Sequence, residues 1–411
     1  MDLGKKIKEW RGDILVSLCL VSILVPTLAL AAQPEERPGN IHIGNLKIYP
    51  SVAITEEYTD NVFLESSGES GSAITTVSPG IMLQLPLRSH LFQLDYHADI
   101  IEASRHHRVY DTDSHFASAL LSLSFNRLQI LTGDNWESNS TIPDYETDIR
   151  NNYYHNRFFV DAIYKLRGRY ELKGFYRNDF RDFDSFRKPG QFDPELDNYM
   201  QNEVGVDLFY RFMPLTSALF EYAFTHRNNE DKGLPSTDFD AHRFWLGLKW
   251  EATAKIAGIV KGGYVTRDYD GPSDDWDGFG MEVDVEYKMS PYYFLTLRGF
   301  RELRETSVTQ DEGVYGTYYV SSGGTLRLTH VFTYKISAFL QGMYWKDDYR
   351  EHGAIGRKRD DDRIGFGCGV HYNIQDWLKC KLYYDYIDND SNIDPEDYKE
   401  NLIGATVLFT F

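Results

Sequence analysis

The chain has 411 residues, a formal net charge of −19, and aromatic side chains at 15% of its positions. Such an acidic chain is unsuited to binding nucleic acid, whose phosphates need a cationic surface. No apolar run beyond the amino terminus is long enough for a membrane-spanning helix, so a helical membrane protein is excluded.

The amino terminus has the features of a secretory signal peptide. Basic residues precede an apolar run from Ile14 to Leu30, and Ala29-Leu30-Ala31 supplies a small-residue cleavage motif. We therefore predict a signal peptide over 1–31 and a short periplasmic segment over 32–45. An uncleaved anchor helix is disfavoured by Pro26 and by the length of the run, which falls short of about 20 residues.

From residue 46 to residue 411 the sequence repeats one unit, an alternating segment of strand length followed by a connection. The alternation is clearest over 279–289, where apolar residues alternate with glycine and charged residues. We predict about eighteen strands, at 46–60, 73–86, 89–104, 112–126, 127–140, 152–165, 169–182, 199–212, 216–229, 239–251, 254–269, 277–289, 292–305, 317–329, 333–347, 362–374, 377–389 and 400–411.

Connection lengths decide between the two all-β architectures that alternation allows, a soluble sandwich and a membrane barrel. Short connections such as 86–89 and 213–215 alternate strictly with longer polar loops such as 183–198 and 348–361. This rhythm is typical of outer-membrane barrels, with short periplasmic turns and long extracellular loops. We predict one transmembrane antiparallel up-and-down β-barrel over 46–411, with a backbone diameter of roughly 35 Å.

The last predicted strand ends on an aromatic residue. Phe411, Phe409 and Val407 fall on one wholly apolar face of that strand. This pattern resembles the strand that the barrel-assembly machinery reads in outer-membrane proteins, so these three residues are predicted to form an assembly signal.

The opposite faces of the predicted strands are rich in charged and aromatic residues. If these faces line the lumen, they form either a solvated wall of weak cross-strand ion pairs or a path on which sugar rings stack. The lumen-lining candidates are Glu282, Asp284, Glu286, Arg298, Trp245, Trp345, Lys379, Lys381, Tyr383 and Asp385.

The sequence gives little indication of catalysis or of a bound cofactor. Glu282 and Asp284 have a spacing that would suit a glycosidase, but acidic pairs are common throughout this chain. The acidic stretch 388–397 has calcium-like spacing but lacks the glycine and the terminal glutamate of such a loop. We expect no metal, no cofactor and no enzymatic activity. Cys368 and Cys380 are predicted to face lipid, with free thiols favoured over a disulfide.

Residues 49–64 resemble the opening strand of the putative beta-barrel porin 2 family. The local motif is the hexapeptide that contains Tyr58, Asp60, Asn61 and Phe63. The signal peptide, the terminal phenylalanine and the strand number are also similar to that family. The resemblance implies an outer-membrane barrel that exports an exopolysaccharide, with outer-membrane lipid, the polysaccharide and a periplasmic polysaccharide-export protein as partners. The alternatives are a general diffusion porin and an outer-membrane enzyme acting on lipid or sugar.

Overall fold

The computed structural model describes residues 41–140, 151–184, 194–230, 237–250, 255–271, 273–306, 317–350, 358–393 and 396–411. The predicted signal peptide and most of the predicted segment 32–45 lie outside these residues. Within the described part of the chain, no helix is long and apolar enough to cross a membrane.

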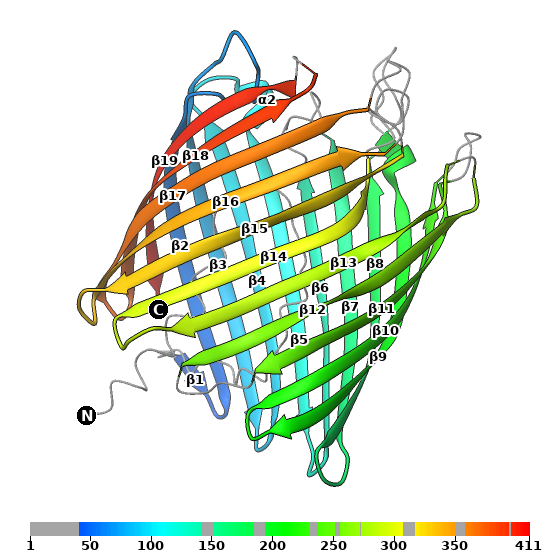
Figure 1. The fold of residues 1–411 in the computed structure, drawn as a ribbon. Helices are drawn as coiled ribbons and strands as arrows, with labels where there is room; N and C mark the ends of the chain where they lie inside the picture. Colours follow the sequence, from blue (N-terminus) through cyan, green and yellow to red (C-terminus); the bar gives the residue numbers. More distant parts are fainter. Residues whose placement is uncertain are drawn as a thin grey trace.

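The described chain is almost entirely β-strand, and Figure 1 shows the strands inclined around one closed wall. The strands are β1 (Ile41–Ile43), β2 (Leu46–Thr59), β3 (Ser72–Leu87), β4 (His90–Ala103), β5 (Thr112–Ser124), β6 (Leu128–Ser140), β7 (Asn152–Lys165), β8 (Tyr170–Phe183), β9 (Tyr199–Met213), β10 (Thr216–Asn229), β11 (Phe239–Trp250), β12 (Ile256–Tyr269), β13 (Trp276–Lys288), β14 (Tyr293–Glu305), β15 (Tyr318–Val331), β16 (Ile336–Tyr349), β17 (Asp360–Gln375), β18 (Leu378–Ser391) and β19 (Tyr398–Thr410). Two short helical turns, α2 (His107–Tyr110) and η2 (Pro194–Asp197), lie in the longer loops.

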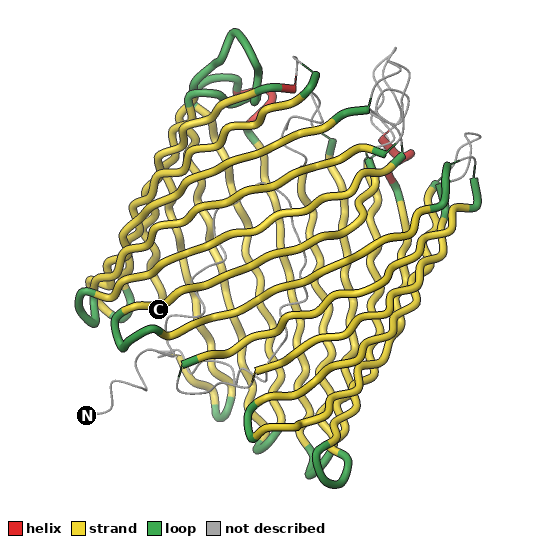
Figure 2. The backbone as a smooth tube through the Cα atoms, viewed as in Figure 1, coloured by secondary structure: helices red, strands yellow, loops and turns green. Residues whose placement is uncertain are grey.

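Each strand from β2 to β19 pairs antiparallel with its neighbours in sequence, and β19 pairs with β2 to close the ring. The wall is therefore an 18-stranded antiparallel barrel, which confirms the predicted fold class and strand number. Closure pairs every strand of the ring on both sides, so the backbone N–H and C=O groups within a bilayer can form hydrogen bonds. The tube in Figure 2 shows short turns at one end and longer loops at the other.

The strand β1 was not predicted. It pairs with β2 from Ile41↔Ile48 to Ile43↔Leu46, while β19 pairs with β2 only from Ser51 onward. The two strands thus lie one after the other along the same edge of β2. A strand of three residues is too short to show a period of two, which is why the sequence did not reveal it.

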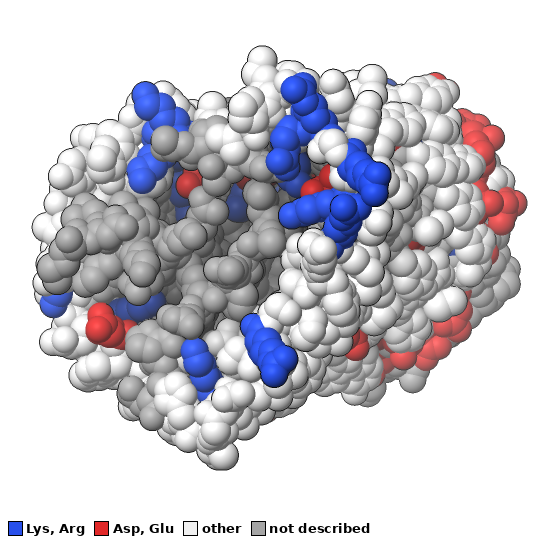
Figure 3. Space-filling model, turned by 90° about the horizontal axis from the view of Figure 1, so that it is seen from below, with Lys and Arg blue, Asp and Glu red and all other residues white. Residues whose placement is uncertain are grey.

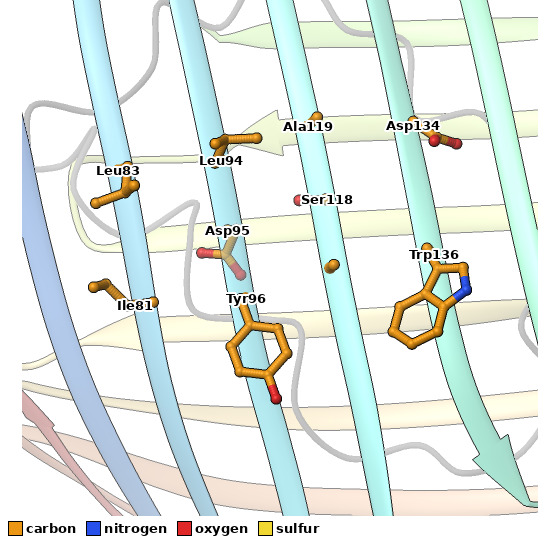
Figure 4. A pocket seen from close by; sticks show the side chains of 10 residues that line it. Ile81, Leu83, Leu94, Asp95, Tyr96, Ser118, Ala119, Asp134 and Trp136 are labelled. Atoms are coloured by element: carbon orange, nitrogen blue, oxygen red, sulfur yellow. The ribbon is translucent and has the colours of Figure 1, made fainter.

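The outer face of the wall is apolar along most of each strand, as a lipid-facing surface requires. A shallow pocket of about 350 Å³ lies on this face over β3–β6 (Figure 4). On the part of β5 that lines it, Ala117 and Ala119 are the outward residues, and Tyr96 and Trp136 stand on either side. One carboxylate, Asp134, is on the same face of β6. Cys368 and Cys380 are also on the outer face, as unbonded thiols.

Candidate functional site: the lumen and its external constriction

The inner face of the wall is identified by contacts between strands that are not neighbours. Arg243 of β11 contacts Glu203 of β9 at 3.2 Å, and Lys261 of β12 contacts Glu221 of β10 at 2.8 Å. Strands two positions apart are separated by roughly 10 Å, so such side chains meet only where the sheet is concave. The charged faces therefore line the lumen.

Two groups of ion pairs run along the middle of this inner wall. In the first, Asp161 contacts Arg177 at 2.6 Å, and Lys173 lies 3.4 Å from Asp207. The second contains Glu203, Glu221, Glu282, Arg243 and Lys261, with Lys261 contacting Glu282 at 3.0 Å. Charges of both signs lie side by side on the wall, so a passing solute meets hydrogen-bonding groups of either charge.

Charge also differs between the two ends of the barrel. Lys and Arg side chains surround the hollowed end seen in Figure 3, which is the end of the short turns. They come from the turns and from the strand ends beside them: Lys47, Arg88, Arg127, Lys165, Arg167, Arg169, Lys255, Lys288 and Lys335. The described parts of the long loops carry many acidic residues: Glu65, Glu69, Asp111, Asp184, Glu195, Asp197, Glu230, Asp238, Asp270, Asp274, Asp275, Glu396 and Asp397.

The first predicted lumen residues lie on the inner faces of β11, β13 and β14. Glu282 is buried and paired with Lys261, and Asp284 lies 3.9 Å from Arg298. Glu286 is half-buried on the same face of β13. Trp245 is buried beneath the cationic groups of Arg243 and Lys261, each about 5 Å from its ring.

The remaining predicted lumen residues lie on β16 and β18. The Lys381 ammonium lies 4.0 Å from the centre of the Tyr383 ring, and the Tyr383 hydroxyl donates to Glu57. Asp385 is opposite Gly367 and Leu402 in the sheet register, and its side chain lies on the same face of β18 as Lys379 and Lys381. Trp345 lies beneath Arg363 of β17, at 5.8 Å. Trp245 on β11 and Tyr383 on β18 thus lie in different parts of the wall.

The external ends of β14 and β15 turn inward, away from β13, while β15 stays paired with β16 as far as Tyr319↔Tyr349. Residues 318–321 are all buried, whereas a wall strand normally alternates. In the two-residue alternation of their strands, Tyr318, Val320 and Leu303 fall on the side that faces lipid; we call this outward parity. They nevertheless pack in one cluster with Phe239 and Tyr269, which lie on the inner face of β11 and β12. The cluster therefore places the outer side of this hairpin against the inner side of another part of the wall.

The pairing between β13 and β14 also shows that the external end of β14 lies away from β13. Pairing between β13 and β14 begins at Met281↔Arg301, although β13 itself starts at Trp276. Pairing between β14 and β15 continues to Glu305↔Tyr318. The sheet thus opens between β13 and β14 but stays intact from β14 to β16, so the β14 edge of the hairpin turns inward. The side-chain Nε of Arg301 donates to the Phe279 carbonyl at 3.2 Å.

One carboxylate fastens the hairpin to the opposite strands. Glu305 contacts Arg227 of β10 at 3.3 Å and also pairs with Arg267 of β12. The three side chains are between 12% and 20% exposed, so the group is largely withdrawn from water without being sealed.

Aromatic rings frame the two arginines. The guanidinium of Arg227 lies 3.7 Å from the centre of the Tyr199 ring, and that of Arg267 lies 4.0 Å from the Phe239 ring. The Tyr269 ring stacks on Tyr318 of the hairpin, with 5.5 Å between centroids. Cation–π contacts of this kind strengthen when water is excluded. We call Arg227, Arg267 and Glu305 the arginine clamp.

The other side of the hairpin faces the lumen and is also packed. Tyr319 stacks on Tyr349 with 4.8 Å between centroids, and the Ser321 hydroxyl donates to Asp347 at 2.5 Å. These two contacts join residues that are opposite each other on β15 and β16, whereas the apolar cluster on the other side holds the β14 edge of the hairpin against β11 and β12 and so narrows the external half of the lumen. Sequence reasoning missed the clamp and the hairpin; the available signal was the consecutive Tyr318-Tyr319-Val320, which interrupts the alternation of β15.

The hexapeptide Tyr58–Phe63 lies at the external end of the seam between β2 and β19. Tyr58 is on the outer face and half exposed. The Asp60 carboxylate accepts hydrogen bonds from the backbone N–H and the side-chain amide of Asn401, at 2.8 and 2.7 Å. Phe63 packs edge-on against Tyr110. The motif thus has a structural place, in which it ties the first long loop to the last strand.

The predicted assembly residues lie at the other end of the same seam. Phe409 pairs with Val52 and stacks on Trp377, with 6.4 Å between centroids. Val407 pairs with Ile54, and the backbone N–H of Phe411 donates to the Pro50 carbonyl at 2.9 Å. Among the described residues, no group of His, Cys, Asp and Glu side chains is arranged to hold a metal ion.

The fold is that of known outer-membrane porins. The chain covers 99% of the outer membrane protein opdK from Pseudomonas aeruginosa with 89% of its own length, at a TM-score of 0.51 and 10% identity. The structure of OpdK with vanillate matches with the same coverage, at a TM-score of 0.50 and 9% identity. Identities this low show a shared fold alone. A comparison with curated proteins finds no match.

The sequence itself also matches a family model. The model described as putative beta-barrel porin 2 matches residues 197–411, which is just over half of the chain. The hexapeptide at 58–63 lies outside this stretch, so the two observations are independent. The family match and the barrel confirm the predicted resemblance and an outer-membrane location, while the hexapeptide itself is not tested by the match. The chain belongs to the putative beta-barrel porin 2 family.

Proposed function

We propose that this protein is a diffusion porin that passes small polar solutes across the outer membrane without catalysis. The observation that carries the proposal is the inner wall, where buried and half-buried charges of both signs line a closed barrel. Such a wall replaces the hydrogen bonds that a polar solute loses with its water, while the paired charges prevent tight capture. Family membership and the shared fold support the same function.

The exopolysaccharide passage expected from the family resemblance receives less support. The comparisons favour the porin alternative, and the β14–β15 hairpin occupies part of the external lumen that a polymer would need. A periplasmic polysaccharide-export protein was expected only as the partner of an exporter, so it has no role in the porin function.

The test is conductance and size selection in a reconstituted membrane. Purified protein in planar bilayers is expected to give discrete current steps, and proteoliposomes are expected to swell in mono- and disaccharides but not in a long oligosaccharide. Heat-modifiable mobility on gels would verify that the barrel is folded. Absence of current and of swelling from folded protein, including a variant with the arginine clamp removed, would refute the porin function.

A further inference from the structure

The arginine clamp has the composition of a binding site for an anion. Two guanidinium groups from different strands converge on one carboxylate, so the cations exceed the anion that they hold. A third arginine, Arg181, also lies over the Tyr199 ring, at 5.7 Å, and Asp179, which accepts from the Tyr199 hydroxyl at 2.8 Å, offsets its charge. Guanidinium groups match carboxylates in shape and hydrogen bonding, and flat rings on their faces suit the apolar part of a small organic acid.

We propose that Arg227 and Arg267 bind the carboxylate of a small organic acid, and that Glu305 is a built-in competitor whose displacement lets the hairpin return to the wall. The proposal rests on the porin function and names the class of solute that would open the passage. In the described structure, Glu305 occupies the site and the hairpin constricts the lumen.

The hairpin is equally suited to a position in the wall. Among its residues with outward parity, Arg301 and Glu305 are charged, and Glu305 would lie opposite Asp277 at the external rim, whereas Leu303, Val320 and Tyr318 are apolar or aromatic, as on the lipid-facing side of the other strands. Leaving the inner cluster would therefore move them to lipid and not to water, which removes most of the cost of exposing apolar surface. Two packings of one element at similar free energy are what a switch requires.

Residues 276–280 of β13 form a sheet edge with which the external end of β14 could pair. Continuing the register beyond Met281↔Arg301 would pair Phe279 with Leu303 and Asp277 with Glu305. At present the Arg301 side chain takes the Phe279 carbonyl that the continued ladder would use. Pairing of residues 276–280 of β13 with β14 would supply new backbone hydrogen bonds in place of the lost contacts.

The affinity for the solute must be modest. Glu305 is attached to the same chain, so it competes at a high effective concentration, on the order of millimolar or above. A free acid therefore displaces it only at ~10 mM or more, which is weak enough for the acid to leave again and continue through the pore.

The experiment uses propionate, which has the chemical structure of the glutamate side chain, and propionamide, its uncharged counterpart. Single-channel currents of the full-length protein are recorded in bilayers at constant ionic strength, with part of the chloride replaced by propionate. We expect 50 mM propionate to raise the fraction of time in the wide state at least fivefold, and propionamide to leave it unchanged.

The variants separate the site from the fold. Glu305→Gln is expected to reside mainly in the wide state and to lose the propionate response, because the competitor is uncharged. Arg267→Met is expected to lose the response as well. Glu286→Gln is the matched control, since Glu286 lies on the inner face of β13 opposite Thr296, away from the clamp; it should respond as the unmodified protein does.

The possible results separate the carboxylate site from the porin function. If the protein conducts but propionate and propionamide act alike, or if Glu305→Gln responds like the unmodified protein, the carboxylate site is refuted and the porin function stands. If neither the unmodified protein nor Glu305→Gln conducts, although both are folded, the porin function itself fails.

Discussion

Asn61 is the buried polar residue whose removal should weaken the barrel most at its seam. Its side chain is fully buried, and its amide donates to the carbonyls of Glu65 and Lys399 at 2.8 and 2.9 Å. Its oxygen accepts from the backbone N–H of Glu65 at 3.0 Å. Substitution by alanine removes three hydrogen bonds and leaves backbone groups without partners where water has little access. At about 1 kcal/mol for each bond, we expect a loss of about 3 kcal/mol in the free energy of unfolding.

The matched control is Asn392, which makes the same kind of bridge at the surface. Its amide donates to the Lys358 carbonyl at 2.8 Å, and its oxygen accepts from the Asp360 N–H at 3.0 Å, but the residue is exposed. Water can replace these bonds, so Asn392→Ala should cost about 0.5 kcal/mol or less. Urea unfolding in lipid vesicles, followed by tryptophan fluorescence, measures both. Equal losses for the two variants would show that burial of the seam does not set the cost.

Three further predictions concern the hairpin, the wall and assembly. Val320→Asp places a charge in the inner cluster, where Val320 is 1% exposed, and should expel the hairpin and raise the single-channel conductance; an unchanged conductance in folded protein would contradict the described constriction. Lys261→Met leaves Glu221 and Glu282 without their shared cation and should shift the reversal potential toward cation selectivity in a salt gradient, whereas an anion shift would be inconsistent with the inner-wall charges. Deletion of Phe411 should lower the amount of assembled barrel several-fold in heat-modifiability gels and leave the conductance of the assembled fraction unchanged; normal assembly would count against an assembly signal at the carboxyl end.

The strands could be read from the sequence because a membrane barrel leaves them little freedom. Lipid on one side and polar lumen on the other impose a period of two, as in β13, and the bilayer fixes the length. The positions of the connections then gave the order and the closure of the ring. The family resemblance added the outer membrane, and both the fold class and the location are confirmed.

The constriction could not be read in the same way. Alternation assigns a residue to one face of its strand, and by that rule Leu303 and Val320 would face lipid. It does not report that a whole hairpin turns inward, because that depends on contacts such as Glu305 with Arg227, which lie 78 residues apart. The sequence likewise indicated acidic and basic lumen residues but not which of them meet. Only the broken alternation at Tyr318-Tyr319-Val320 marked the place.

The segregation of charge between the two ends of the barrel has an electrical consequence. An ion that enters from the cell surface first meets acidic loops, while one that enters from the periplasm first meets a basic rim. Mobile cations gather at the first mouth and mobile anions at the second, so the two directions of current draw on unequal local concentrations of carriers. The pore should thus behave as a rectifier whose asymmetry fades as added salt shortens the reach of the fixed charges.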